Sequence, residues 1–256
     1  MQMTKDISLY KTNFKNTEYD RRVEIDKSIA LIDKLEKERS LGLEEYKYLV
    51  ENLNEEVFDY ISKKARILGD ENYGKDIYLR GLIEISNICK NDCYYCGIRH
   101  SNKNCDRYRL SDEEIIECAD EGYRLGYRTF VMQGGEDGKF EPDYICSIVK
   151  KIKEKYKDVA VTLSLGEYEK EDYQKMFDAG ADRYLLRHET ADKEHYEKLH
   201  PKQMSFEHRM NCLKALKDIG FQVGCGFMVG SPYQSSFTLA KDLKFIEEFG
   251  PQMCGI

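Results

Sequence analysis

The sequence lacks several features that would assign it to a membrane, secreted or nucleic-acid-binding class. It contains no tryptophan, which excludes nothing, and no apolar run approaches the roughly 20 residues of a membrane-spanning helix. Its first 22 residues have no apolar core of the secretory type, and they are too rich in acids and amides for a transit peptide. These absences predict a cytoplasmic protein with no membrane contact.

An excess of positive charge is missing too. Lysine and arginine total 40 against 47 acidic residues, which gives a net charge of -7. Such a chain has no long-range field to attract phosphates, so we expect a small-molecule substrate and no nucleic acid. The nine cysteines are odd in number and dispersed, which favours metal binding or buried thiols over disulfides. Three of them occupy helical apolar positions and are expected in the core: Cys118, Cys146 and Cys212.

The chain is long enough for one large α/β domain, because barrels of this class need roughly 250 residues. Residues 1–75 are expected to form a polar segment to about residue 22 and a helical extension, with one helix beginning at Val23. A second helix is predicted over 43–68, ended by the polar stretch 69–75 that contains Gly69.

From Asp76 onward, short apolar runs alternate with amphipathic helices. A capping box from Ser111 to Glu114 opens a helix over 115–125, and Pro142 suits the first turn of a helix over 144–156. This alternation predicts a parallel sheet in an α/β fold, a TIM-type (β/α) barrel over residues 76–256. The predicted strands are 77–85, 129–132, 159–165, 183–186 and 221–229.

The length from Asp76 suffices for about six units of roughly 30 residues, and a sixth strand begins near Met253. The barrel is therefore expected to be incomplete, with five to six strands. An open last strand invites association, so we expect the isolated chain to aggregate or to bind its ligand poorly.

Three cysteines follow the first predicted strand with C-x3-C-x2-C spacing: Cys89, Cys93 and Cys96. Three thiolates can hold three irons of a four-iron cubane and leave the fourth iron open for a ligand that is not protein. A zinc site with His100 as fourth ligand and a set of unrelated buried thiols are the alternatives. Structural zinc sites usually have a second ligand pair on a separate knuckle, which this sequence does not offer.

Polar residues follow the second and third predicted strands. Gly134 and Gly135, before Glu136, let the backbone approach a ligand closely, although a plain tight turn explains the same residues. Thr162 and Ser164 share one face of the third strand, where they suggest either a polar ligand or satisfied core hydroxyls.

A charged cluster follows the fourth predicted strand and faces the mouth of the expected barrel. Arg187 can hold an anion, and Glu189 can accept hydrogen bonds from ribose hydroxyls. Arg209, on a following helix, can bind a carboxylate in a forked geometry. Ordinary surface charge is the alternative for each residue, and the histidines, His188 among them, are interpreted as structural.

The cysteine spacing, with an aromatic residue before the last cysteine, resembles the signature of the radical S-adenosylmethionine (SAM) superfamily. The resemblance implies a 4Fe-4S cluster on Cys89, Cys93 and Cys96, and SAM bound to its open iron. It places Tyr95 beside the adenine and the backbone of residues 134–136 at the SAM amino group. The implied reaction is cleavage of SAM to a 5′-deoxyadenosyl radical.

Longer stretches are similar to the HydE family of iron-only (FeFe) hydrogenase maturases: 95–99, 102–104, 107–109, 161–167 and 181–191. This similarity implies a role in assembling the di-iron subcluster of the hydrogenase. The implied partners are a scaffold GTPase, a second radical SAM maturase and a reductant such as ferredoxin or flavodoxin. It places Glu189 and Arg209 at SAM, and it lines an internal cavity with Thr162, Arg183 and Arg187. Ser164 is a further candidate for cofactor binding.

Other functions stay open at this point. A methylornithine synthase has a similar segment at residues 107–109 but lacks the Arg-His-Glu-Thr sequence of residues 187–190. Biotin synthase is a more distant relative, whose usual ligands for a second cluster are not identifiable here. A non-catalytic iron-sulfur or zinc-binding module is the alternative from another class.

Overall fold

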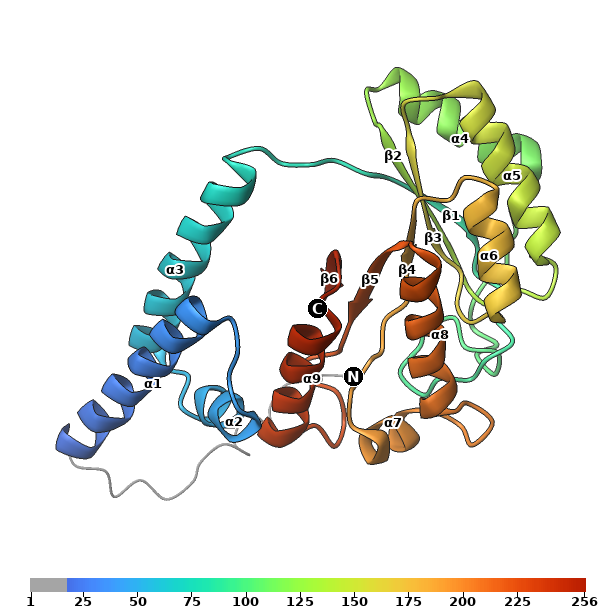
Figure 1. Ribbon diagram of the computed structural model, residues 1–256. Coiled ribbons are helices and arrows are strands. Elements are labelled where there is room, and N and C mark those ends of the chain that lie inside the picture. Colours follow the sequence, from blue (N-terminus) through green and yellow to red (C-terminus); the bar gives the residue numbers. More distant parts are fainter. Residues whose placement is uncertain (1–17) are drawn as a thin grey trace. The chain divides into compact units, whose positions relative to one another are not determined.

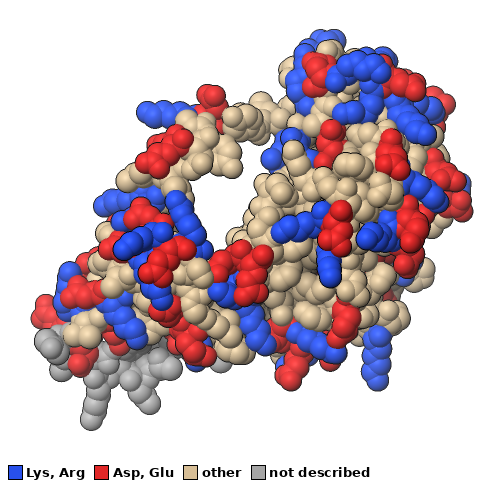
Figure 2. Space-filling view, viewed as in Figure 1, with Lys and Arg blue, Asp and Glu red and all other residues tan. Residues whose placement is uncertain are grey.

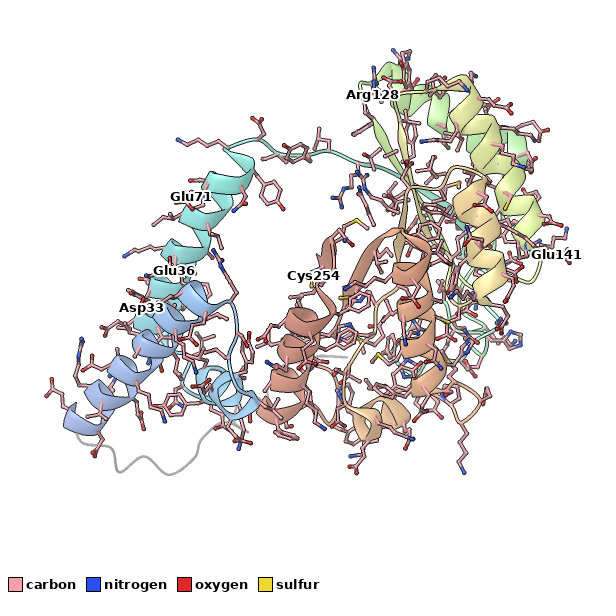
Figure 3. The ribbon with its side chains drawn as sticks, viewed as in Figure 1. Asp33, Glu36, Glu71, Arg128, Glu141 and Cys254 are labelled. Atoms are coloured by element: carbon pink, nitrogen blue, oxygen red, sulfur yellow. The ribbon has the colours of Figure 1, made fainter. Side chains whose placement is uncertain are left out.

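The computed structural model describes residues 18–256, so predictions for residues 1–17 lie outside it (Figure 1). The chain divides into two compact units, residues 1–75 and residues 76–256. The first contains the helices α1 (Glu18–Glu38), α2 (Leu43–Glu51) and α3 (Glu55–Tyr73). Its small core contains Ile25, Ile32 and Val57. On its surface, Lys64 of α3 pairs with Asp33 and Glu36 of α1, at 2.9 and 2.6 Å; both acids are labelled in Figure 3.

The prediction of one helix over 43–68 is wrong, because the chain breaks after α2. The Asn54 side chain accepts a hydrogen bond of 3.1 Å from the Val57 amide and caps a new helix, α3. Gly69 does not end α3, since it lies in the helix with open space around its Cα, and the helix ends at Gly74, where φ is 64°. α1 extends further toward the N-terminus than predicted, since it already includes Glu18.

The second unit contains one six-stranded parallel sheet whose strand order is the order of the sequence. This confirms the predicted parallel α/β architecture, since such an order is that of successive (β/α) barrel units. The predicted strands over 77–85 and 221–229 were too long. The observed strands are β1 (Gly81–Ser86), β2 (Thr129–Gly134), β3 (Ala160–Ser164), β4 (Arg183–Leu185), β5 (Gln222–Gly226) and β6 (Met253–Gly255).

Helices connect the strands and cover one face of the sheet (Figure 1). The predicted capping box is confirmed, since the Ser111 hydroxyl accepts from the Glu114 amide at 3.3 Å while the Glu114 carboxylate accepts from the Ser111 amide at 2.7 Å. Pro142 is the first residue of its helix, as predicted. The helices are α4 (Asp112–Arg124), α5 (Pro142–Lys155), α6 (Lys170–Asp178), α7 (Lys193–Leu199), α8 (Phe206–Ile219) and α9 (Ser236–Phe249).

The two faces of the sheet differ in chemistry. The helix-covered face is apolar and buried, with residues such as Ile85, Met132, Leu163, Tyr184 and Val223. The other face carries polar side chains in register across three strands, because Thr162, Arg183 and Gln222 are successive partners. A barrel turns this second face inward, so its polar residues are placed to meet a polar ligand.

The surface of the second unit is mixed in charge. On the face shown in Figure 2, acidic and basic side chains alternate over its helices without an extended area of one sign. No helix within residues 18–256 is both long and apolar enough to cross a membrane. Of the three cysteines expected in the core, Cys146 and Cys212 are buried, but the prediction for Cys118 is wrong. Cys118 is exposed because it lies at the edge of the buried stripe of α4, beside an open hollow.

Candidate functional site

The cysteines lie in a long loop that joins β1 to α4. Backbone hydrogen bonds close its base, from the Asn87 amide to the Tyr108 carbonyl at 3.4 Å and from the Leu110 amide to the Ile85 carbonyl at 2.9 Å. Within the loop, the guanidinium of Arg107 donates to four backbone carbonyls, at 2.5 to 3.1 Å, and so organises the turns around the cysteines. The acceptors are Asn87, Ile98, Arg99 and Asn102.

Asp137 ties both ends of this loop together. Its buried carboxylate accepts two hydrogen bonds from the Arg109 guanidinium, at 2.6 and 2.7 Å, and one from the Ser86 hydroxyl at 2.8 Å. The Lys139 amide donates a fourth, at 3.0 Å. Burial opposes ionisation of Asp137, but these donors outweigh it, and the pKa of Asp137 lies below its ordinary value. The Asp137 carboxylate therefore holds together Ser86, before the loop, and Arg109, at its end.

The three cysteine thiols are free and partly buried. Burial raises the pKa of Cys93 to about 12 and also raises the pKa of Cys89, and the neighbouring thiols contribute to both shifts. Iron binding would therefore displace protons from these thiols. Thiols grouped on one loop are the donor set that an iron-sulfur cluster requires, so the residues fit this group.

The zinc alternative is less compatible with this arrangement. Among residues 18–256, no three side chains of His, Cys, Asp or Glu converge on a single-ion position, whereas a tetrahedral zinc site needs four such ligands around one ion. His100, the candidate fourth ligand, is exposed. A cubane distributes its thiolates over separate irons, so it does not require one point of convergence.

Gly134 and Gly135 support the cysteine loop from β2. A Cβ atom on Gly135 would lie 2.3 Å from the Ile88 carbonyl oxygen and 2.8 Å from the Cys89 Cβ, so only glycine fits. At Gly134 the nearest atom would be the Ser86 carbonyl oxygen, at 3.1 Å. These glycines have a packing reason that is independent of any ligand.

Glu136 connects the ends of β2 and β3. Its backbone carbonyl accepts from the Lys90 amide at 2.9 Å, and its carboxylate lies 3.2 Å from the Lys90 ammonium. The carboxylate also accepts from the Glu167 amide at 3.1 Å. Gly166 makes room for it, with φ at 87° and a hypothetical Cβ only 2.1 Å from the Glu136 Cγ.

Arg209 of α8 lies at the same carboxyl edge and is buried. Its Nε donates to Glu167 Oε1 at 2.5 Å, and its Nη1 donates to the Arg187 carbonyl at 2.9 Å. The candidate SAM ligand is thus held in one orientation by two partners. Glu167 was not singled out from the sequence, and no local signal marks its pairing with a residue 42 positions away.

Glu189 lies beside these residues with a strained backbone, since its φ is 65°. Its carboxylate is 3.4 Å from Arg187 Nε and largely buried. Burial raises the pKa of Glu189, while Arg187 and Arg209 oppose that shift. The charged cluster predicted after the fourth strand is therefore present, and it is compact.

The proposed cavity residues lie at different heights along the sheet. Thr162 is buried on β3, and its hydroxyl has no hydrogen-bond partner in the described part of the chain. Arg183 is its neighbour in register but lies at the amino end of β4, where it donates to Gln222 at 2.7 Å and to Thr129 at 3.3 Å. Ser164 ends β3. The structure thus brings Ser164 and Arg187 to the cysteine-loop edge, and Arg183 to the opposite one.

These two edges can be followed in Figure 3. Arg128, labelled just before β2, marks the amino edge, and Glu141, labelled just before α5, marks the carboxyl edge.

Tyr95 has a partner that sequence reasoning missed. Its hydroxyl lies 2.9 Å from His200 Nε2, and His200 Nδ1 lies 2.9 Å from the Tyr196 carbonyl. A carbonyl can only accept, so Nδ1 carries the proton and Nε2 accepts from Tyr95. Burial lowers the pKa of His200 to about 4, which keeps the ring neutral. His200 was interpreted only as structural, because nothing in the sequence links it to Tyr95.

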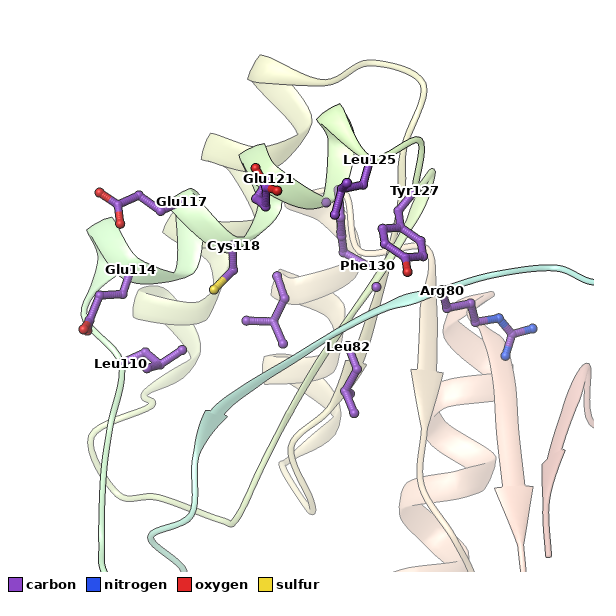
Figure 4. A pocket seen from close by; sticks show the side chains of 13 residues that line it. Arg80, Leu82, Leu110, Glu114, Glu117, Cys118, Glu121, Leu125, Tyr127 and Phe130 are labelled. Atoms are coloured by element: carbon purple, nitrogen blue, oxygen red, sulfur yellow. The ribbon is translucent and has the colours of Figure 1, made fainter.

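A separate hollow of about 640 Å³ lies between β1 and α4 (Figure 4). Apolar side chains such as Leu82, Leu125 and Phe130 line it, with Cys118 and glutamates of α4 along it. None of the candidate site residues contributes to it, so it lies apart from the cysteine loop.

The family model described as the radical SAM superfamily matches residues 83–246. The match includes all three loop cysteines, Glu189 and Arg209. This chain belongs to the radical SAM superfamily. Membership confirms the predicted family, and it implies a 4Fe-4S cluster and SAM as the cofactors.

Curated relatives and a solved structure agree with this assignment. The chain is 50% identical over 183 residues to the [FeFe] hydrogenase maturase subunit HydE of Thermotoga maritima, covering 72% of this chain and 52% of that protein. It is 30% identical over 196 residues to 3-methylornithine synthase of Methanosarcina acetivorans, covering 76% and 54%. The crystal structure of methylornithine synthase (PylB) superposes with a TM-score of 0.79 at 26% identity, covering 88% of this chain and 66% of that one. The chain spans about half the length of the curated relatives it matches.

Proposed function

We propose that this radical SAM protein cleaves SAM and takes part in assembling the di-iron subcluster of FeFe hydrogenase. The 50% identity to HydE carries the proposal. In it, residues 76–256 are the catalytic domain and residues 1–75 a polar N-terminal segment and helical extension. The proposed setting is the cytoplasm, with a scaffold GTPase, a second radical SAM maturase and a ferredoxin or flavodoxin as partners.

The loop cysteines Cys89, Cys93 and Cys96 are the proposed cluster ligands. When bound, the cluster supplies the electron that breaks SAM into methionine and a 5′-deoxyadenosyl radical. The anchoring of the loop supports this role, because Asp137 ties its two ends and Gly135 packs against Cys89. A ligand loop that is ordered before the cluster binds pays less entropy when it does.

The residues around the loop are proposed to bind SAM. Arg209 is a charge-assisted donor suited to a carboxylate, and Glu189 is an acceptor suited to ribose hydroxyls. Tyr95 is proposed to lie along the adenine, with His200 holding its hydroxyl. The remaining proposed SAM-binding residues are Gly134, Gly135, Glu136 and Ser164.

The polar face of the sheet is the proposed substrate cavity. Thr162 supports this, because a buried hydroxyl without a partner is costly unless a ligand satisfies it. Arg187 and Arg183 carry permanent charge toward the two edges of the same face, which suits an anionic or metal-bound small molecule.

A maturation assay tests the proposal. Hydrogenase produced without its di-iron subcluster is incubated anaerobically with the other maturation proteins, SAM and a reductant, with or without this chain. We expect hydrogenase activity to depend on the chain and to be lost with Cys93→Ala. Equal activity without the chain would contradict the maturase role.

The similarity to 3-methylornithine synthase supports a second candidate. Mass spectrometry for 3-methylornithine, after incubation with the amino acids of a cell extract, distinguishes the two. We expect none. Its formation, together with no effect on hydrogenase, would favour the synthase.

A further inference from the structure

Residues 188–191 follow β4 at the carboxyl edge of the sheet, in a conformation that the local sequence does not favour. Glu189 has a φ of 65°, which residues with a Cβ seldom adopt. Two backbone hydrogen bonds hold it, from the Glu189 amide to the Gly226 carbonyl at 2.9 Å and from the Met228 amide to the Glu189 carbonyl at 3.1 Å. An extended backbone at Glu189 would turn its carboxylate away from the proposed SAM site. Other contacts must therefore hold the segment in its observed conformation.

The next residues along the chain are clamped from behind by α9. Asp242 of α9 is completely buried, and its Oδ1 accepts from the Ala191 amide at 2.5 Å. His188, also completely buried, has its Nε2 3.5 Å from the same oxygen. The segment is therefore held on both sides of Glu189, by β5 in front and by α9 behind.

The hydrogen-bond pattern defines the tautomer of a neutral His188 ring. Its Nδ1 accepts from the Gly226 amide at 3.3 Å, so the proton of a neutral ring is on Nε2, the nitrogen that lies 3.5 Å from Asp242 Oδ1. Neither His188 Nε2 nor Asp242 Oδ2 has a hydrogen bond in residues 18–256. Phe245 and Phe227 pack around the ring, at 4.5 and 6.0 Å between centroids, and keep the surroundings apolar.

A carboxylate in such surroundings is costly unless a donor compensates it. Asp242 accepts a hydrogen bond from the Ala191 amide, and the His188 Nε2 lies 3.5 Å from the same oxygen; both groups belong to the segment that carries Glu189. The Asp242 carboxylate therefore stabilises the one backbone arrangement that brings this amide and this ring to it.

We infer that Asp242 and His188 are positioning residues, which hold Glu189 in its left-handed conformation so that its carboxylate faces the SAM site. The inference rests on the proposed role of Glu189 in SAM binding. Neither residue needs to touch SAM, since both lie behind the segment.

The test compares Asp242→Asn with a matched control, Asp192→Asn. Asparagine keeps the size of Asp242 but removes its charge. Asp192 directly follows this segment, where it caps α7 through the His195 amide and pairs with Lys241 at 2.7 Å. Asparagine serves equally well as a cap, so the control removes a charge and its pairing with Lys241 of α9 but leaves both contacts of Asp242 in place.

The first readout is amide hydrogen exchange of the cluster-free protein. We expect the Glu189 and Met228 amides, which do not contact Asp242, to exchange at least tenfold faster in Asp242→Asn and to be unchanged in Asp192→Asn. Unchanged exchange at both amides overturns the inference, because a purely local role would affect only Ala191. Where Asp242→Asn yields too little folded protein, His188→Phe retains the ring volume and removes the nitrogen that faces Asp242, and the same increase is expected.

The second readout is SAM affinity of the reconstituted protein, measured by titration. Asp242→Asn is expected to weaken SAM at least fivefold, with iron content unchanged, and Asp192→Asn less than twofold. Faster exchange with unchanged SAM affinity overturns the positioning role. If Glu189→Gln also leaves SAM affinity unchanged, the proposed role of Glu189 itself is wrong. If Glu189→Gln lowers SAM affinity and Asp242→Asn does not, only the positioning role of Asp242 and His188 is wrong.

Discussion

Replacing Asp137 by alanine should destabilise the second unit and loosen the cysteine loop together. The carboxylate is buried and accepts four hydrogen bonds, two of them from Arg109. Breaking a buried ion pair by removing one partner costs about 3 to 5 kcal/mol. The Arg109 side chain is 27% exposed and can recover some hydration, so we expect the lower limit, about 3 kcal/mol. For a domain of this size that corresponds to roughly 6 to 12 °C in Tm.

The contribution of Asp137 to the free energy of unfolding should depend on pH in a defined direction. The pKa of folded Asp137 lies below its ordinary value of 3.8, so its contribution to stability is complete above pH 3.8 and is lost as the pH falls through the folded pKa. The difference in unfolding free energy between wild type and Asp137→Asn should therefore be largest near pH 7 and shrink below pH 3.8.

Urea unfolding followed by circular dichroism measures both effects, and iron content after anaerobic reconstitution reports on the loop. Asp143→Asn is the matched control, because the Asp143 side chain is 89% exposed and should change stability by less than about 0.5 kcal/mol. If Asp137→Ala costs less than about 1 kcal/mol and incorporates iron normally, the anchor does not hold the loop.

Three further changes probe the remaining contacts of the site. Gly135→Ala should lower iron incorporation severalfold, because its new methyl group would meet the Ile88 carbonyl; normal iron content would contradict this packing. His200→Phe should leave iron content unchanged and lower SAM affinity severalfold, since the Tyr95 hydroxyl loses its acceptor. If the two residues act as a unit, adding Tyr95→Phe to this variant should lower SAM affinity no further. Arg209→Ala should lower SAM affinity about tenfold or more, as expected for loss of a charge-assisted hydrogen bond of about 1.5 to 3 kcal/mol. A titration that shows wild-type affinity would exclude Arg209 from the site.

The sequence predicts well those features that depend on neighbouring residues. The alternation of apolar runs and amphipathic helices gave the parallel sheet, and Ser111 with Glu114 gave a helix start, because both signals are local. Local signals were also overruled. Asn54 started a new helix inside a continuous helical pattern, and Gly69 did not stop α3, since a glycine inside a helix costs it only about 1 kcal/mol.

The site was only partly predictable. The spacing of Cys89, Cys93 and Cys96 identified the family, which the family match confirms. Contacts between distant segments left no trace in a single sequence, as the pairing of Glu167 with Arg209 and that of Tyr95 with His200 show. The roles assigned to the individual SAM-binding and cavity residues stay predictions, because each is defined by a ligand rather than by the chain.

The central claim is that the three loop cysteines hold a cluster that cleaves SAM. The most direct measurement is 5′-deoxyadenosine, quantified by mass spectrometry after anaerobic reconstitution with iron and sulfide, reduction and addition of SAM. We expect its formation by the wild-type chain and none above background with Cys93→Ala, which should also lose the iron-sulfur absorbance. Equal formation by both proteins at equal iron content would contradict the assignment of the cysteines.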